Sequence, residues 1–378
     1  MDEMERMRRI SQQREAYLEQ KRQKIRQRQR YVRRLKFFLV VGACVVGASI
    51  IAILLLVMFH KPSKTKDLSQ QTERIESNDS NMEETEKTQK SVSESPYVTV
   101  GDAVFLSGFE AKETSATLPL PTGSDELISE YALLINENTN EIVAQKNAKE
   151  RVNPASMTKI LTILVAAEHV ENMEAKVEIT REVTDYVYVN DCSAVGYEVG
   201  EKAPVKDLFY GTILPSGADA AVTLAKYVSG SQEAFVDLMN EKIKELGLSE
   251  TSHFTNCVGL YDENHYCTIY DMAMILKAAL QNDFCRDVLS AHTFTTTKTK
   301  QHPKGITVSN LFLRRIEDRD SGGLVVGAKT GFVNQSGSCA ASYQISDSGT
   351  PYICVTAKSS SSWQCIYDHV YIYKNYAS

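Results

Sequence analysis

Several patterns that would indicate metal or triad chemistry are missing from this 378-residue sequence. Its seven histidines are scattered, with no H-x-x-x-H pair and no His/Cys pair at metal-ligand spacing, so we predict no metal site and no cofactor. No G-x-S-x-G motif marks the nucleophile of a Ser-His-Asp hydrolase, and no segment repeats. These absences exclude the common metal-dependent and triad enzymes as first interpretations.

Cysteines at paired spacing are also lacking. None of the eight cysteines lies in a C-x-x-C motif, and the seven that follow Cys44 are an odd number. At least one of these seven is therefore free or pairs between chains. For the others, reduced core cysteines and a disulfide framework both stay open as interpretations.

The body of the chain has no excess of positive charge. The formal net charge is −6, but residues 1–36 hold 13 Lys and Arg against 5 Asp and Glu, a net charge of +8. The rest of the chain carries a net charge of −14, which disfavours nucleic acid as a partner. With 43% hydrophobic and 24% charged residues, the composition is globular, and it excludes a fibrous or wholly disordered chain.

One long uncharged run is present at residues 37–59. Its 23 residues suffice to cross a hydrocarbon core of about 30 Å as a helix. The basic residues before the run place that flank in the cytoplasm, so everything after it is expected outside the cell membrane. A cleaved signal peptide is the weaker interpretation, because the run exceeds the usual apolar length and no small-residue cleavage site follows. We predict a single-pass signal anchor whose partner is the lipid bilayer.

The segments around this span predict a four-part chain. Residues 1–36 are a basic cytoplasmic segment, either a solvated flank or a helix that lies on anionic lipid. Residues 60–124 are predicted to be an extracellular linker, mostly disordered, because residues 61–96 contain few large apolar side chains and no aromatic. Within this linker, residues 97–124 are more apolar and either add a strand to the domain or stay linker. Residues 125–378 are the globular domain.

Hydrophobic periodicity predicts an α+β domain. Two apolar stretches around a polar turn are typical of a β-hairpin, at residues 131–136 and 141–145. Four helices are predicted next, at residues 157–170, 219–228, 232–246 and 269–280. The first of them is apolar on nearly all sides. Strands then return before a last helix at 362–373; they are expected at 293–297, 305–313, 324–329, 338–345 and 351–357. This order predicts an antiparallel sheet closed by both chain ends, with a helical part inserted.

The first of three short motifs carries a serine and a lysine. Ser156 and Lys159 form S-x-x-K at the start of the apolar helix, where positions i and i+3 share a face. A lysine among apolar neighbours has a lowered pKa and can act as a base. The positive end of the helix favours developing oxyanion charge near the serine. Alone, such a pair is more often incidental.

The other two motifs are also weak in isolation. Ser-Gly-Ala at residues 216–218 is, by itself, a turn with a helix cap. Lys-Thr-Gly at residues 329–331 ends an apolar strand, and a phosphate-binding loop is the rival interpretation. That rival is rejected, because Ala328 breaks the required Gly-Lys adjacency and no helix follows.

Taken together, the three motifs are specific. They occur in the order S-x-x-K, Ser-Gly, K-T-G, with spacings of 60 and 113 residues. The arrangement resembles the penicillin-recognising serine acyl-transferases. More finely, segments 151–159, 214–221 and 251–273 are similar to low-molecular-mass penicillin-binding proteins that act as serine D-Ala-D-Ala carboxypeptidases. The resemblance covers about residues 125–378 and implies a beta-lactamase/transpeptidase-like domain.

The resemblance implies three catalytic residues. Ser156 would attack the carbonyl of a peptidoglycan stem peptide ending in D-Ala-D-Ala and form an acyl-enzyme; beta-lactam antibiotics would acylate the same oxygen. Lys159 would take the proton of Ser156, and Ser216 would relay a proton to the leaving amine. Water would then free the acyl group.

The resemblance also implies the substrate-binding residues. Lys329 and Thr330 would hold the terminal carboxylate, with Gly331 completing the motif. The backbone N–H groups of Ser156 and Phe332 would form the oxyanion hole. At the second motif the chain departs from the family, because Ala218 stands where many members have an asparagine that helps to position the substrate amide.

Two further departures concern the end of the chain. No arginine follows Arg319, although the family often carries one near the carboxylate end of the site, so either Lys358 substitutes or the contact is lost. Only 47 residues follow Gly331. We therefore expect no separate β-rich C-terminal domain and no terminal amphipathic helix, with the N-terminal anchor replacing them.

Two alternative functions stay open. A β-lactamase would need assisted acyl-enzyme hydrolysis, and no E-x-x-L-N segment lies between Ser216 and Lys329. A catalytically weak penicillin-binding or cell-wall-peptide-binding protein is suggested by Ala218. The intact Ser156 and Lys159 disfavour it.

Overall fold

The computed structural model of the chain describes residues 97–100, 103–106, 109–123 and 125–377. The predictions for residues 1–96, including the membrane span at 37–59, lie outside this part. Among the described residues, no helix has both the length and the apolar character needed to cross a bilayer. The described chain begins with a separate antiparallel hairpin of β1 (Tyr97–Val100) and β2 (Ala103–Leu106).

A six-stranded sheet joins the two ends of the domain. Its spatial order is β12 (Gly323–Val333), β13 (Gly337–Ser346), β14 (Pro351–Ser359), β4 (Tyr131–Asn136), β5 (Glu141–Lys146) and β3 (Leu118–Pro119). All neighbours are antiparallel except β3 and β5. The predicted hairpin and the closure of the sheet by both chain ends are confirmed. Of the two alternatives for residues 97–124, a strand is present at β3.

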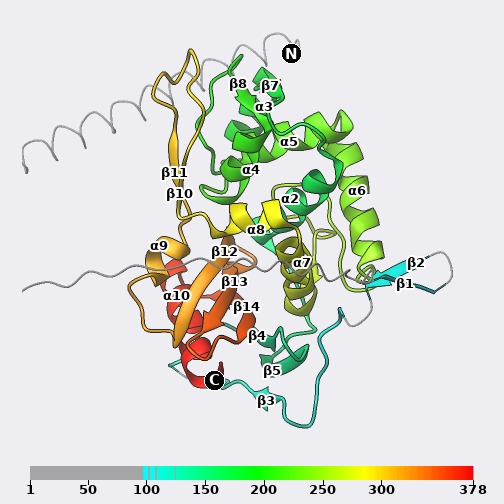
Figure 1. Cartoon of the computed structure of the whole chain (residues 1–378), viewed down its shortest axis with the longest axis vertical. Helices are drawn as coiled ribbons and strands as arrows, with labels where there is room; N and C mark the ends of the chain where they lie inside the picture. The colour runs from blue at the N-terminus through cyan, green and yellow to red at the C-terminus, as the bar shows by residue number, and fades with distance from the viewer. Residues whose placement is uncertain (1–96, 101–102, 107–108, 124, 378) are drawn as a thin grey trace, which may run out of the picture. The chain divides into compact units, whose positions relative to one another are not determined.

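Both faces of the sheet are covered. Along β4, Leu133 and Ile135 belong to the main hydrophobic cluster, which includes α7 (Ile269–Gln281), whereas Leu134 belongs to a second cluster with α10 (Ser362–Tyr376). Figure 1 shows α7 and α10 on opposite sides of the strands. Because successive strand residues point to opposite faces, a strand buried on both sides is hydrophobic throughout, as the sequence of β4 is.

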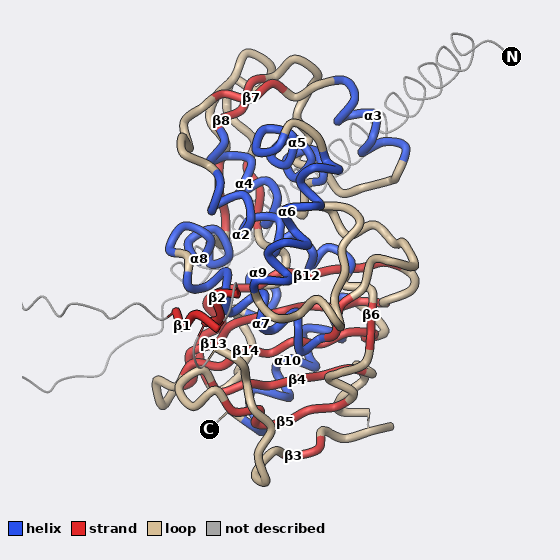
Figure 2. The backbone as a smooth tube through the Cα atoms, turned by 90° about the vertical axis from the view of Figure 1, so that its right-hand side faces the viewer, coloured by secondary structure: helices blue, strands red, loops and turns tan. Residues whose placement is uncertain are grey.

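The helical part is inserted between β5 and β12. At its centre lies α2 (Thr158–His169), of which the first nine residues are buried, as its all-round apolar sequence predicts. Around it pack α5 (Ala218–Ser229) and α6 (Gln232–Glu245), both predicted. Figure 2 shows these helices gathered beyond one edge of the sheet. Among the helices that were not predicted individually are α3 (Arg181–Val189), α4 (Val205–Ile213) and α8 (Asp283–Ser290).

The strand predicted at residues 305–313 is only partly correct. The chain pairs as β11 (Thr307–Ser309) with β10 (Thr293–Thr295), and a short helix, α9 (Leu313–Ile316), then begins. Asn310 ends the strand, because its Oδ1 accepts hydrogen bonds from Phe312 N at 3.0 Å and Leu313 N at 3.2 Å. A side chain that bonds its own following backbone competes with strand pairing.

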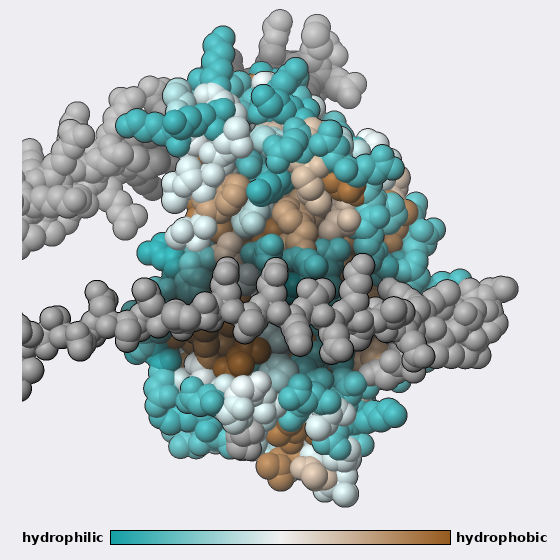
Figure 3. All heavy atoms as spheres, in the orientation of Figure 1, coloured by the Kyte–Doolittle hydropathy of each residue, from teal (hydrophilic) through white to brown (hydrophobic). Residues whose placement is uncertain are grey.

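The structure also decides the cysteine question for the described residues. The seven cysteines after Cys44 are free thiols, six buried and Cys192 half-buried. They act as small apolar core residues rather than as a disulfide framework. On the face drawn in Figure 3, hydrophobic residues appear in separate patches bordered by hydrophilic ones.

Candidate active site

The S-x-x-K serine sits at a strained bend before α2. It belongs to a single 3-10 turn, η1 (Ala155–Met157), and Ala155 has φ +47°, a value that L-residues rarely adopt. Asn153 supports this bend, because its Oδ1 accepts a hydrogen bond from Ala155 N at 3.0 Å. The bend presents a half-buried Ser156 at the N-terminal end of the apolar helix. Strained backbone of this kind clusters at functional sites.

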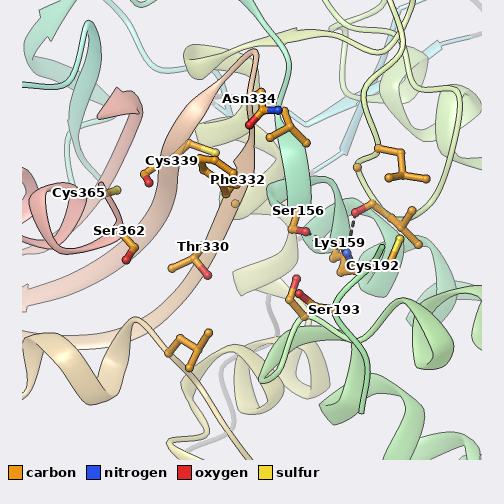
Figure 4. Close-up of a pocket in the computed structure, with 18 of the residues that line it drawn as sticks. Ser156, Lys159, Cys192, Ser193, Thr330, Phe332, Asn334, Cys339, Ser362 and Cys365 are labelled. Atoms are coloured by element: carbon orange, nitrogen blue, oxygen red, sulfur yellow. Dashed lines mark hydrogen bonds between the residues drawn. The ribbon is translucent and has the colours of Figure 1, made fainter. Parts of the chain in front are cut away.

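Lys159 lies against that serine. Its Nζ donates to Ser156 Oγ at 3.0 Å and to the Val258 carbonyl at 2.6 Å, and the residue is 2% exposed. Burial lowers the pKa of Lys159 to about 8, so roughly a tenth of the amine is neutral at pH 7 and about half at pH 8. Figure 4 shows the two side chains pointing toward each other. The pair meets the geometric requirement for a nucleophile and its base.

The second and third motifs meet each other directly. Lys329 Nζ donates to Ser216 Oγ at 2.9 Å and to the Thr330 carbonyl at 2.7 Å. Ser216 has φ +62°, and Lys329 is 1% exposed. Burial, together with the positive charge of Lys159, lowers the pKa of Lys329 well below its usual value. The two serines and two lysines of the three motifs therefore form two hydrogen-bonded Ser–Lys pairs.

One cavity connects these pairs. Its volume is about 870 Å³, and it is lined by Ser156, Lys159, Ser216, Thr330, Gly331 and Phe332 among others. Figure 4 shows Thr330 and Phe332 on the strand that borders the cavity, across from Ser156. Lys329 and Ala218 do not line it. Ala218 is 1% exposed at the start of α5, and its N–H donates to the Ser193 carbonyl at 2.8 Å.

A loop from the 251–273 segment forms the back of the site. Gly259 has φ +85°, and a Cβ built on it would lie 1.8 Å from the Ala155 carbonyl oxygen. Only glycine therefore allows this approach to the nucleophile turn. His265 anchors the loop: it is 1% exposed and bonds Thr158 Oγ1 at 2.9 Å. Burial lowers the pKa of His265 to about 4, which agrees with its interpretation as a structural loop residue.

Sequence reasoning missed one cation of the cavity. Arg315 lines the cavity and lies over the Trp363 ring, with 5.2 Å between its guanidinium carbon and the ring centroid. The suggestion that Lys358 substitutes for a family arginine is not supported, because Lys358 does not line the cavity and pairs with Glu130 at 3.3 Å. Arg315 comes from α9, before the third motif, so no local pattern marks it.

Metal ligation has no support in the described residues, since no cluster of three or more His, Cys, Asp or Glu side chains there could hold an ion. The polar groups that line the cavity are mainly hydroxyls and amides, with the Lys159 amine and the Arg315 guanidinium. A family model described as D-alanyl-D-alanine carboxypeptidase, peptidase family S11, matches residues 114–360. The chain belongs to this family.

Individual family members support the assignment. D-alanyl-D-alanine carboxypeptidase DacF of Bacillus subtilis is 41% identical over 150 residues, which are 40% of this chain and 38% of that protein. DacA of Escherichia coli is 34% identical over 190 residues, 47% of this chain and 45% of that protein. The matched region thus spans less than half the length of these two relatives.

The family fold is also present. The solved structure of the Streptomyces K15 DD-transpeptidase superposes with a TM-score of 0.60 and 30% sequence identity, over 67% of this chain and 99% of that one. The chain is therefore similar over almost the whole length of a DD-peptidase domain. The predicted α+β domain, with its sheet and inserted helices, is confirmed.

Proposed function

We propose that this chain is a serine D-Ala-D-Ala carboxypeptidase that removes the terminal D-alanine from peptidoglycan pentapeptide stems and is inhibited by beta-lactams. The observation that carries the proposal is the pair of Ser–Lys hydrogen bonds, 3.0 Å at Ser156 and 2.9 Å at Ser216, at one cavity. Membership of the carboxypeptidase family supports the same reaction.

Acylation needs a base and an acid, and the site offers both. Neutral Lys159 accepts the Ser156 hydroxyl proton while Oγ attacks the carbonyl carbon between the two D-alanines. The C–N bond then breaks, and a proton passes through Ser216 to the leaving nitrogen. D-alanine therefore departs with a neutral amino group. Water next attacks the ester, which returns Ser156 Oγ and frees the shortened peptide as its carboxylic acid.

Two groups can stabilise the charges of the substrate. The oxyanion is proposed to accept from the N–H groups of Ser156 and Phe332; a Cβ on Gly331 would lie 3.0 Å from Ser156 N, so β12 and the nucleophile turn are close enough to share one oxygen. The terminal carboxylate is proposed to meet the Thr330 hydroxyl. Lys329 donates to the Thr330 carbonyl at 2.7 Å, and the Arg315 guanidinium lines the same cavity.

The nucleophile is tested with two assays on one variant. Ser156→Ala should abolish D-alanine release from a D-Ala-D-Ala pentapeptide and also covalent labelling by a fluorescent penicillin, because both need the same oxygen. Ser290→Ala, on helix α8 at a residue that does not line the cavity, is the matched control and should retain both activities. If Ser156→Ala is still labelled by penicillin, another residue is the nucleophile. Labelling of the wild type without D-alanine release would favour the binding-protein alternative.

The location of the enzyme is a separate proposal. Residues 37–59 anchor the chain in the cell membrane, with residues 1–36 in the cytoplasm and the catalytic domain outside, joined by a linker that ends before the sheet strand β3. Support comes from the uncharged run and from its basic flank. Protease added to intact protoplasts should digest the domain and spare an N-terminal tag. The reverse pattern of protection would overturn the outside placement.

A further inference from the structure

Asp219 is a buried carboxylate beside the second motif with no assigned role. It is 2% exposed, in the first turn of α5. Its Oδ1 accepts from Val195 N at 2.8 Å and from Ala220 N at 2.9 Å, and its Oδ2 accepts from Gly196 N at 2.9 Å and Tyr197 N at 3.3 Å. Since all four donors are backbone N–H groups and both oxygens accept, the geometry suits the ionised carboxylate.

Three of these donors belong to a segment that reaches the cavity. Asn190, Asp191, Cys192 and Ser193 line it, and Figure 4 shows Ser193 close to Ser156 and Lys159, opposite the β12 strand. Residues 193–197 belong to no helix or strand, so regular secondary structure does not hold them in place. Their links to α5 are the Asp219 bonds and the bond from Ala218 N to the Ser193 carbonyl, 2.8 Å.

Val195 and Asp219 also pack closely against the turn that carries Ser216. A Cβ on Gly217 would lie 2.7 Å from Val195 Cγ2 and 2.8 Å from Asp219 Oδ1, so the turn and the segment touch without a gap. Ser216 itself adopts φ +62°, a costly backbone value that persists only where surrounding contacts impose it. Val195, held by Asp219, supplies one such contact.

We propose that Asp219 is a positioning residue for the reaction: by gathering the N–H groups of Val195, Gly196 and Tyr197, it fixes the 190–197 segment as one wall of the cleft and holds the Ser216 turn toward Lys329. This inference rests on the proposed carboxypeptidase function. Asp219 touches no substrate, so it acts through the two groups that it places. A displacement of about 1 Å at such groups can cost a hundred-fold in rate.

Asp219 also contributes to the pKa of Lys159. The titratable groups that act on Lys159, or on which Lys159 acts, come from five places in the fold: Cys192, Asp219, Cys257, His265 and Lys329. Burial raises the pKa of Cys257 to about 12 and also raises that of Cys192, so both thiols stay neutral near pH 8. Of this set, Asp219 is the carboxylate, and it raises the pKa of Lys159 against the larger effect of burial.

The test uses Asp219→Asn in the full chain, with Asp207→Asn as matched control. Asp207 is another buried carboxylate, on α4, that accepts a backbone N–H, from Thr297, and it does not line the cavity. We expect Asp219→Asn to lower kcat for D-alanine release, and the rate of penicillin acylation, by about ten- to a hundred-fold, with KM changed much less. The midpoint of the rise of rate with pH should also move to lower pH, which loss of folding alone would not cause. Asp207→Asn should show neither effect.

A second pair of variants keeps the test decisive if Asp219→Asn folds poorly. Gly196 is exposed with φ +101°, and Gly230, at the end of α5, has φ +85°; neither glycine has a neighbouring atom where a Cβ would point. Alanine strains either position, but only Gly196→Ala disturbs the segment that Asp219 holds. It should slow acylation several-fold more than Gly230→Ala does.

Failures of the two proposals are distinguishable. A wild-type chain that neither releases D-alanine nor reacts with penicillin would refute the proposed function. A reactive wild type would refute the role of Asp219 if folded Asp219→Asn kept its rate and pH midpoint. Equal rates for Gly196→Ala and Gly230→Ala would count against it in the same way.

Discussion

Lys159 and Lys329 are both buried amines, but their surroundings differ. Lys159 lines the cavity and donates to Ser156 Oγ, while Lys329, a residue of β12 that does not line the cavity, donates to Ser216 Oγ. Burial brings the pKa of Lys159 to about 8, the range in which a lysine can exchange its proton with a hydroxyl. Under the proposed function, this difference assigns the base to Lys159 and leaves Lys329 to orient the second serine.

The pKa of Lys159 predicts how the rate depends on pH. The neutral amine is the base, and it is populated above the pKa, so penicillin acylation should rise with pH and level off above about 8. Well below that value the rate should fall about ten-fold per pH unit. Second-order acylation rates between pH 5.5 and 9.5 would measure this. A rate that is flat across the range, or falls as pH rises through 8, contradicts Lys159 as the base.

Arg315 allows a prediction on substrate selectivity. Its guanidinium lines the cavity, so Arg315→Gln should lower kcat/KM for the free-acid peptide by about ten- to a hundred-fold, the effect of losing one hydrogen bond to a charged group. A peptide amidated at its C-terminus should be affected much less.

The neighbouring Arg314 provides the matched control. It is exposed and donates to Ser309 Oγ, and it does not line the cavity, so Arg314→Gln should leave the preference for the free acid unchanged. If Arg315→Gln lowers kcat/KM equally for the free-acid and the amidated peptide, Arg315 does not recognise the carboxylate.

At the scale of elements, one carboxylate of helix α10 bonds groups from two separate segments of the domain. Asp368 is fully buried and accepts from Ile128 N at 3.1 Å, Ser129 N at 3.0 Å and Ser359 Oγ at 2.8 Å. These donors come from the segment before β4 and from the end of β14. Asp368 thus holds together the strands that join the two ends of the domain.

This tie predicts a large effect of a small substitution. Asp368→Asn replaces one acceptor oxygen by an N–H₂ group and leaves buried donors unmatched, so the free energy of unfolding should fall by about 2–4 kcal/mol. Urea unfolding would measure the loss. Asp283→Asn, at an exposed side chain of α8, is the control and should change stability by less than about 0.5 kcal/mol. Similar losses for both variants would contradict the role of the tie.

For the whole molecule, two buried histidines predict sensitivity to acid. Burial lowers the pKa of His265 and of His369 to about 4, from 6.5. Between these values the unfolded chain binds protons that the folded chain does not, so the free energy of unfolding should fall as pH drops from 6.5 toward 4. Each histidine contributes at most about 1.4 kcal/mol per pH unit.

Urea midpoints across this pH range would test the prediction. His369 is the more informative site, because its ring is fully buried and Ser342 and Thr356 bond its two nitrogens at 2.8 and 3.0 Å. A stability that is constant from pH 6.5 to 5 would show that these rings are charged in the fold.

Much of the fold could be read from local patterns. The hairpin of β4 and β5, the apolar helix α2 and the capping of α7 at Thr268 are decided by residues within one or two turns of each other, where periodicity and side-chain capping act. The pairing of Ser156 with Lys159 is local as well, because residues three positions apart lie on the same face of a helix. Helices α3 and α4 were missed because their short sequences, nine residues each, give little periodicity to detect.

The sequence by itself determined the family, the class of fold and the order of the reactive motifs, because these depend on residue types at fixed spacings. Only the tertiary structure decided that Lys329 bonds Ser216 across 113 residues, that Arg315 rather than Lys358 lines the cavity, and that Asp219 holds the cleft wall. These contacts join elements far apart in the chain. Their geometry follows from how helices and sheet pack, and no local period or propensity records it.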